Sequence, residues 1–233
     1  MVKFDKSSTV GEIVAARPSL SRVMDRHGIS YCCGGGKSLE AACAKKGVDV
    51  EAVLAEITKA MAAPPEKNLT ALSLGDLVEH VVNQHHCFLK ETLPAVSRQL
   101  DRVVTVHGAK HAELAQAQTV FNRFAADMMA HMDKEEQVLF PLISSLGGPQ
   151  EHPMAKNLER IISAMEADHD DSGKDLTELR KLLHDYTPPE GACGTYRAML
   201  KGLADIEEDT QLHILAENSV MFPKAVSAVA TVS

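Results

Sequence analysis

Residues 131–141 read His-Met-Asp-Lys-Glu-Glu-Gln-Val-Leu-Phe-Pro, and residues 213–223 read His-Ile-Leu-Ala-Glu-Asn-Ser-Val-Met-Phe-Pro. Both stretches follow one pattern, His-x3-Glu-x4-Phe-Pro, inside regions where apolar residues recur at helical spacing. Because proline interrupts the hydrogen-bond ladder of a helix, we expect each Phe-Pro pair to end a helix. The repeated pattern therefore predicts two equivalent helix ends in one region of the chain.

A second repeat lies upstream of each of these stretches. His86 precedes His131 by 45 residues, and His169 precedes His213 by 44 residues. The region therefore reads as two related helical hairpins, each with one histidine on its first helix and the His-x3-Glu pair on its second.

Apolar residues beyond Ser73 form four long stretches with helical spacing. The four predicted apolar faces contain Leu74, Leu77, Val78, Val81, Val82, Leu89, Leu93 and Val96; Val120, Phe121, Phe124, Met128, Met132, Val138 and Leu139; Leu158, Ile161, Ile162, Met165, Leu176, Leu179 and Leu183; and Tyr196, Met199, Leu200, Leu203, Ile206, Leu212, Leu215 and Val220. Glycine and proline residues near 108, 147–149 and 187–189 separate the stretches. Four long helices with short connections indicate an antiparallel four-helix bundle.

The segment before residue 63 reads instead as several short helices. Thr9, Ser38 and Asp49 stand where they would cap helices that begin at the following residue. Two prolines at 64–65 stop the last of these helices. We therefore predict an all-α protein with a small helical, cysteine-containing domain at residues 1–62, a linker at 63–70 and the bundle at 71–233.

The composition excludes several classes of function. The formal charge of −8 argues against nucleic acid or an anionic membrane surface as a partner. The first residues lack the apolar core of a signal peptide, and no apolar run is long enough to span a bilayer. We therefore expect a cytoplasmic protein, in which five cysteines are not a disulfide framework.

The spacing of histidine and glutamate within each repeat has a direct chemical reading. Residues i and i+4 share a helix face, so each His-Glu pair points at one spot. A lone pair of this kind is usually a surface ion pair, but two copies with matching upstream histidines favour a metal site. Imidazole and carboxylate together suit iron, manganese or zinc, and two bridging carboxylates suggest two metals about 3.5–4 Å apart. The six candidate ligands are His86, His131, Glu135, His169, His213 and Glu217.

Several motifs, in order along the chain, resemble those of one known family. They are Tyr31-Cys32-Cys33-Gly34-Gly35, the stretch at 131–141, Ala-Asp-His-Asp-Asp at 167–171, Thr-Pro-Pro-Glu-Gly-Ala-Cys at 187–193 and the stretch at 213–223. The chain thereby resembles the repair-of-iron-centres (RIC) family, of the ScdA/YtfE/DnrN type, which joins a short cysteine-containing domain to a hemerythrin-like domain. The extra glycine Gly36 departs from the family motif, and Asp127 and Asp168 stand where the family has acidic residues near its site.

The resemblance implies two non-haem iron ions with an oxo or hydroxo bridge. The four histidines at 86, 131, 169 and 213 would be terminal ligands, and Glu135 and Glu217 would be bridging carboxylates. The implied function is repair of iron-sulfur clusters damaged by nitric oxide or oxidative stress, through iron donation, removal of nitric oxide, or both. Damaged iron-sulfur proteins would be the clients, an electron donor would be needed, and a homodimer is left open.

Two other functions remain open at this point. The first is an enzyme, a nitric oxide reductase that couples two nitric oxide molecules to nitrous oxide at the di-iron site. The second is a hemerythrin-like protein that binds or senses dioxygen. Four predicted histidine ligands instead of five, and an attached dithiol segment, argue against the second reading.

Other histidines and cysteines need separate assignment. Periodicity does not choose between His85 and His86, whereas the repeat spacing and the family resemblance favour His86. His107 falls at the predicted hairpin tip, roughly 30 Å from the metal at 1.5 Å per residue, so we interpret it as a structural turn residue. Cys32 and Cys33 precede a glycine run and a helix start, which favours a redox or iron-transfer dithiol over incidental turn cysteines.

Overall fold

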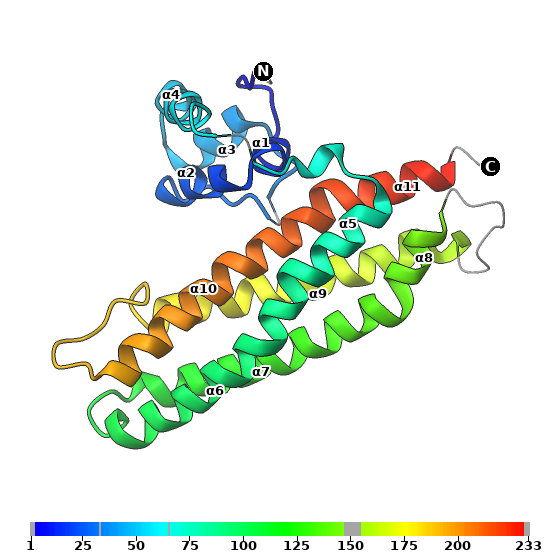
Figure 1. Ribbon diagram of the computed structural model, residues 1–233. Helices are drawn as coiled ribbons and strands as arrows, with labels where there is room; N and C mark the ends of the chain where they lie inside the picture. The colour runs from blue at the N-terminus through cyan, green and yellow to red at the C-terminus, as the bar shows by residue number, and fades with distance from the viewer. Residues whose placement is uncertain (1–2, 33, 65, 147–154, 231–233) are drawn as a thin grey trace. The chain divides into compact units, whose positions relative to one another are not determined.

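The computed structural model describes residues 3–32, 34–64, 66–146 and 155–230 (Figure 1). Every regular element in this part of the chain is helical, and the two strand-like residues Thr9 and Ser38 form only an isolated bridge. The predicted all-α class is confirmed. The chain divides into two compact units, residues 80–142 with 157–210, and residues 1–79 with 143–156 and 211–233. The predicted turn at 147–149 lies outside the described residues.

The unit at 80–142 and 157–210 is built from four long helices. Its elements are the π-helical η3 (Val81–His86), α6 (Cys87–His107), α7 (Glu113–Lys134), the π-helical η4 (Glu135–Leu139), α9 (Leu158–Leu182) and most of α10 (Gly194–Ala216). Figure 1 shows these long helices side by side, and α7 packs against both α6 and α9. The short connection between α6 and α7 makes this pair antiparallel, as the predicted bundle requires.

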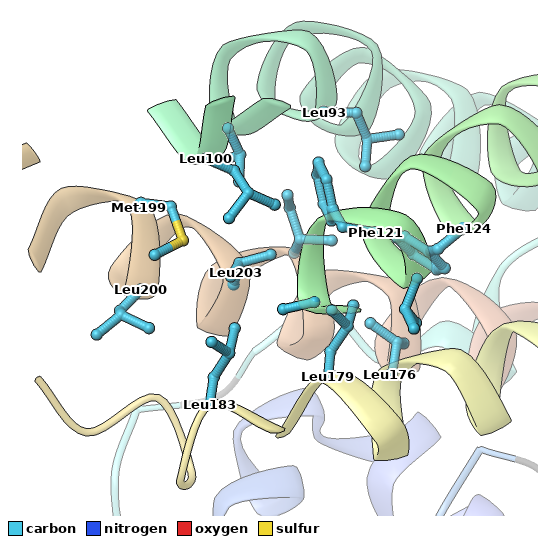
Figure 2. Close-up of a cluster of buried hydrophobic side chains, with 14 of the residues drawn as sticks. Leu93, Leu100, Phe121, Phe124, Leu176, Leu179, Leu183, Met199, Leu200 and Leu203 are labelled. Atoms are coloured by element: carbon cyan, nitrogen blue, oxygen red, sulfur yellow. The ribbon is translucent and has the colours of Figure 1, made fainter. Parts of the chain in front are cut away.

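The core of this unit comes from one apolar face of each helix. Figure 2 shows leucines, phenylalanines and Met199 from all four helices meeting in one cluster. Phe121 and Phe124 both belong to this cluster, with ring centroids 6.4 Å apart. Burial of these side chains provides the main stabilisation of the bundle, because aromatic residues remove the largest apolar area from water.

The two Phe-Pro pairs do not end helices, so that prediction was wrong. Helix α8 (Phe140–Ser145) follows η4 directly, and α11 (Phe222–Ala230) follows the π-helical η6 (Glu217–Met221). The N–H of Phe140 bonds to the carbonyl of Glu135, and the N–H of Phe222 bonds to that of Glu217, both five residues back. The wider π turn makes room for the proline ring, which would clash with a carbonyl in a regular α-helix.

The π turn also explains why the prediction for one core residue was wrong. Val138 was expected on the buried face of its helix, but it is 41% exposed, whereas Leu139 is fully buried. An extra residue in the turn of η4 rotates the following side chains relative to a regular helix. Ordinary helical spacing therefore misassigns this position.

The unit at 1–79, 143–156 and 211–233 contains the short N-terminal helices. They are α1 (Val10–Ala16), the 3-10 turn η1 (Pro18–Leu20), α2 (Ser21–Arg26), α3 (Leu39–Lys46), α4 (Val50–Ala60), the 3-10 turn η2 (Leu69–Ala71) and α5 (Leu74–His80). The side chains of Thr9, Ser38 and Asp49 cap α1, α3 and α4 as predicted. The core of these helices includes Leu215, from the end of α10. The linker predicted at 63–70 remains a prediction.

Two glycines bring the cysteine-containing loop against η6 within this unit. The N–H of Gly11 donates to the carbonyl of Gly35 over 2.8 Å. A Cβ atom on Gly35 would lie 2.5 Å from the carbonyl oxygen of Tyr31 and 2.8 Å from Oγ of Ser219. The Tyr31 hydroxyl donates to Oε1 of Gln211 over 2.8 Å. Only glycine permits so close an approach of the loop backbone.

We expect Gly35→Ala to destabilise this unit by about 1–3 kcal/mol, because a methyl group would collide with a backbone oxygen that cannot move alone. Gly36→Ala is the matched control, since nothing lies within 4 Å of a Cβ at that position. Urea unfolding followed by circular dichroism measures both variants. Equal midpoints for the two variants would contradict the close approach at Gly35.

Among the described residues, no helix combines the length and the apolar character needed to cross a bilayer.

Candidate metal centre

His86 is positioned by the π-helical segment η3 at the start of α6. Its side chain is 1% exposed, and its ring stacks on Phe140 at a centroid distance of 5.5 Å. Nε2 lies 3.2 Å from Oε2 of Glu135, and Nδ1 donates to Oε1 of Glu136 over 2.7 Å. Because Nδ1 donates its hydrogen to Glu136, the lone pair lies on Nε2, which faces Glu135.

A second set of contacts links His131, near the end of α7, to His169 in the middle of α9. Nε2 of His131 lies 3.2 Å from Oε1 of Glu135, one helical turn later. Nε2 of His169 lies 3.0 Å from Nε2 of His131, and all three side chains are buried. The two imidazoles thus turn the same nitrogen toward one point beside the carboxylate.

His213 and Glu217 repeat this relation on the other His-x3-Glu pair. Nε2 of His213 lies 3.1 Å from Oε1 of Glu217, and neither side chain has any exposed surface. Glu217 is the first residue of η6, as Glu135 is the first residue of η4. The sequence repeat is therefore a structural repeat, in which each glutamate opens a π turn.

The predicted ligands form two groups of four whose ligand atoms lie within 4.8 Å of one another. The first group is His86, Glu135, His213 and Glu217, and the second is His131, Glu135, His169 and Glu217. Both glutamates occur in both groups. Imidazole nitrogens with carboxylate oxygens, and no thiolate, form a donor set that suits iron. Cations held here would also offset the charge of two buried carboxylates. The structure thus contains a buried His/Glu cluster suited to iron.

Two further carboxylates contact the ligand histidines from outside. Glu136 accepts from Nδ1 of His86 and also from Nζ of Lys90, over 2.8 Å. Burial opposes ionisation of Glu136, but the hydrogen bonds from Lys90 and His86 hold its pKa below the usual value. Sequence reasoning did not single out Glu136 or Lys90, although Glu136 directly follows a predicted ligand.

Asp168 has the corresponding place beside His131. Its Oδ2 atom lies 3.4 Å from Nδ1 of His131 and accepts from Nζ of Lys134 over 2.9 Å. Partial burial favours a higher pKa for Asp168, but the hydrogen bonds from Lys134 and His131 outweigh this effect. The pKa of Asp168 therefore lies below its usual value. Asp127, the other acidic residue expected near the site, lines a surface hollow beside His131 together with Asp168.

The structure separates the ambiguous histidines. His85 is buried, but its Nδ1 lies 2.9 Å from Oδ1 of Asp209, and it is in neither ligand group. His107 is also in neither group. Its Nε2 lies 3.3 Å from Sγ of Cys193, and its ring lies 5.3 Å from that of Tyr196. These contacts between the end of α6 and the start of α10 fit the structural role that we predicted for His107.

The predicted dithiol is only partly described. Cys32 is half-buried, with Sγ 3.9 Å from the hydroxyl of Ser30. Cys33 lies outside the described residues. The four described cysteines form no disulfide with one another. Burial raises the pKa of the Cys43 thiol.

Comparison with known proteins gives matches in both parts of the chain. The family ScdA_N, described as a domain of unknown function (DUF542), matches residues 6–61, and the hemerythrin HHE cation binding domain matches residues 76–225. Proteins named iron-sulfur cluster repair protein YtfE from Enterobacter sp. (strain 638), Citrobacter koseri and Escherichia coli O157:H7 are each 32% identical to it over 222 residues. Each alignment covers 95% of this chain and 98% of the relative.

Proposed function

Since this chain belongs to the repair-of-iron-centres family, we propose that it repairs iron-sulfur clusters damaged by nitric oxide or oxidative stress. The observation that carries the proposal is the buried His/Glu cluster, whose two ligand groups share both glutamates. Relatives that align over nearly the whole chain are named iron-sulfur cluster repair proteins. In this chain ScdA_N precedes the hemerythrin domain, and an alignment over 95% of the chain includes residues of both, which supports a common function.

In this proposal the six residues of the cluster hold two iron ions. The histidines at 86, 131, 169 and 213 would be the terminal ligands, and Glu135 and Glu217 would be the bridging carboxylates. Support comes from the membership of both glutamates in both groups and from the donor set. Iron held there would supply a redox-active cation able to bind a diatomic ligand such as nitric oxide or to be donated to a damaged cluster. The side chains around it exclude water and hold the imidazole nitrogens toward one point.

Cys32 and Cys33 are the proposed redox or iron-transfer thiols. Their loop contains Gly35, whose backbone approaches Ser219 of η6, two residues after Glu217. A loop in contact with the π turn of a bridging glutamate is suitably placed for transfer between thiol and iron. The clients would be damaged iron-sulfur proteins in the cytoplasm, with a separate electron donor.

An anaerobic repair assay tests the proposal. An aconitase-type enzyme whose cluster has been damaged with nitric oxide is incubated with the diferrous protein, and recovered activity is compared with nitrous oxide in the headspace. We expect recovery with iron-loaded protein and none with metal-free protein. Nitrous oxide in proportion to added nitric oxide, without cluster recovery, would favour the reductase reading. A stable, reversible dioxygen adduct without either result would favour the hemerythrin-like reading.

A further inference from the structure

A surface lysine is connected to the buried His86 through one carboxylate. Nζ of Lys90 donates to Oε1 of Glu136 over 2.8 Å, and the same oxygen accepts from Nδ1 of His86 over 2.7 Å. Lys90 lies four residues after His86 in one continuous helical run, so the two side chains share a face. Both Lys90 and Glu136 are about one-third exposed, which places this connection at the rim of the cluster.

A second lysine has the same relation to His131. Nζ of Lys134 donates to Oδ2 of Asp168 over 2.9 Å, and this oxygen lies 3.4 Å from Nδ1 of His131. Lys134 lies three residues after His131, again one helical turn away. The two carboxylates come from different elements, Glu136 from η4 and Asp168 from α9. A lysine, a carboxylate and an imidazole are thus linked in this order twice, and the two carboxylates come from unrelated backbone positions.

This arrangement has a consequence for the imidazoles. A carboxylate that accepts the Nδ1 hydrogen keeps the Nε2 lone pair available and fixes the ring orientation. Nε2 of His86 and Nε2 of His131 each lie 3.2 Å from an oxygen of Glu135. His86 belongs to one ligand group and His131 to the other, so each group has one histidine held in this way.

We propose that Lys90 and Lys134 are positioning residues, one for each iron, that hold Glu136 and Asp168 against the Nδ1 hydrogens of the two ligand histidines. The proposal rests on the proposed roles of His86 and His131 as ligands. Each lysine donates to a carboxylate that in turn contacts the ligand histidine, so each acts through that carboxylate.

The direction in which a lysine substitution changes iron binding distinguishes a positioning role from a simple charge effect. An ammonium group near a cation repels it, so removing the lysine charge would by Coulomb's law alone tighten iron binding. Loss of positioning has the opposite effect, because a freed carboxylate no longer fixes the imidazole. Lys90→Met and Lys134→Met remove the charge and keep much of the aliphatic stem.

The first readout is made on the full-length protein without metal. Proton and nitrogen-15 NMR of the histidine rings reports the hydrogen bond that each ring N–H makes. In wild type we expect a strongly hydrogen-bonded Nδ1–H at both His86 and His131. Lys90→Met should weaken the Nδ1–H signal of His86 and leave that of His131 unchanged, and Lys134→Met should do the reverse.

The second readout is the release of ferrous iron to a colorimetric chelator such as bipyridine. We expect each variant to release one of its two irons about tenfold faster, the lower end of the effect typical for outer carboxylate partners. Lys90→Met should have the larger effect, because Nδ1 of His86 lies 2.7 Å from Glu136, whereas Nδ1 of His131 lies 3.4 Å from Asp168. Lys90→Arg should restore slow release.

Lys174→Met on α9 is the matched control, since it breaks an exposed ion pair with Asp171 that touches no histidine. Unchanged Nδ1–H signals, or iron release that is unchanged or slower in both lysine variants, would overturn the proposal. Failure of the wild type to bind iron would instead overturn the proposed function, and the Nδ1–H measurement would still decide the positioning role.

Discussion

Glu135→Ala should abolish the proposed coupled pair of irons, reducing the iron content from the proposed two per chain to one or fewer. The two oxygens of Glu135 lie 3.2 Å from Nε2 of His86 and 3.2 Å from Nε2 of His131, and the residue belongs to both ligand groups. No other side chain except Glu217 is shared in this way among the described residues. Iron analysis combined with Mössbauer spectroscopy measures both the stoichiometry and the coupling.

Two controls separate ligand loss from loss of fold. Glu135→Gln keeps the volume of the side chain but removes its charge, and it should also lose the coupled pair. Glu91→Ala removes an exposed carboxylate of α6 and should retain two irons. The helical circular dichroism signal should be the same in all three variants. A Glu135→Ala protein with a normal coupled pair would refute the proposed bridge.

Phe121→Ala should lower the free energy of unfolding by about 3–5 kcal/mol, the range measured for loss of a buried phenylalanine. Phe121 is fully buried in the bundle core and packs against Phe124 (Figure 2). Such a loss is a large part of the roughly 5–15 kcal/mol that stabilises an ordinary domain. Urea unfolding of the metal-free protein, followed by circular dichroism, gives the value.

Val106→Ala is the control for this core substitution. Val106 is 65% exposed on α6, and its truncation should change the free energy of unfolding by no more than about 0.5 kcal/mol. Similar losses in the two variants would contradict the assignment of Phe121 to the core. The comparison uses metal-free protein because bound iron would add its own stabilisation to the folded state.

Local features of the chain were sufficient for most of the helical architecture. Thr9, Ser38 and Asp49 cap the helices that they were expected to cap, because capping depends on residues within one turn. The apolar spacing identified the long helices, and the paired His-x3-Glu stretches with their upstream histidines identified the residues that the structure brings together. Spacing along a helix fixes which side chains share a face, so this information is present before the helices pack.

Tertiary packing decided what lies beyond one helical turn. Phe140 and Phe222 continue their helices through π turns, and neither this nor the exposure of Val138 follows from regular spacing. The contact of Gly35 with Ser219 and the contact of Glu136 with His86 join residues far apart in the chain. Periodicity assigns a side chain to a face of its helix, but only the packed helices determine which atoms it meets there.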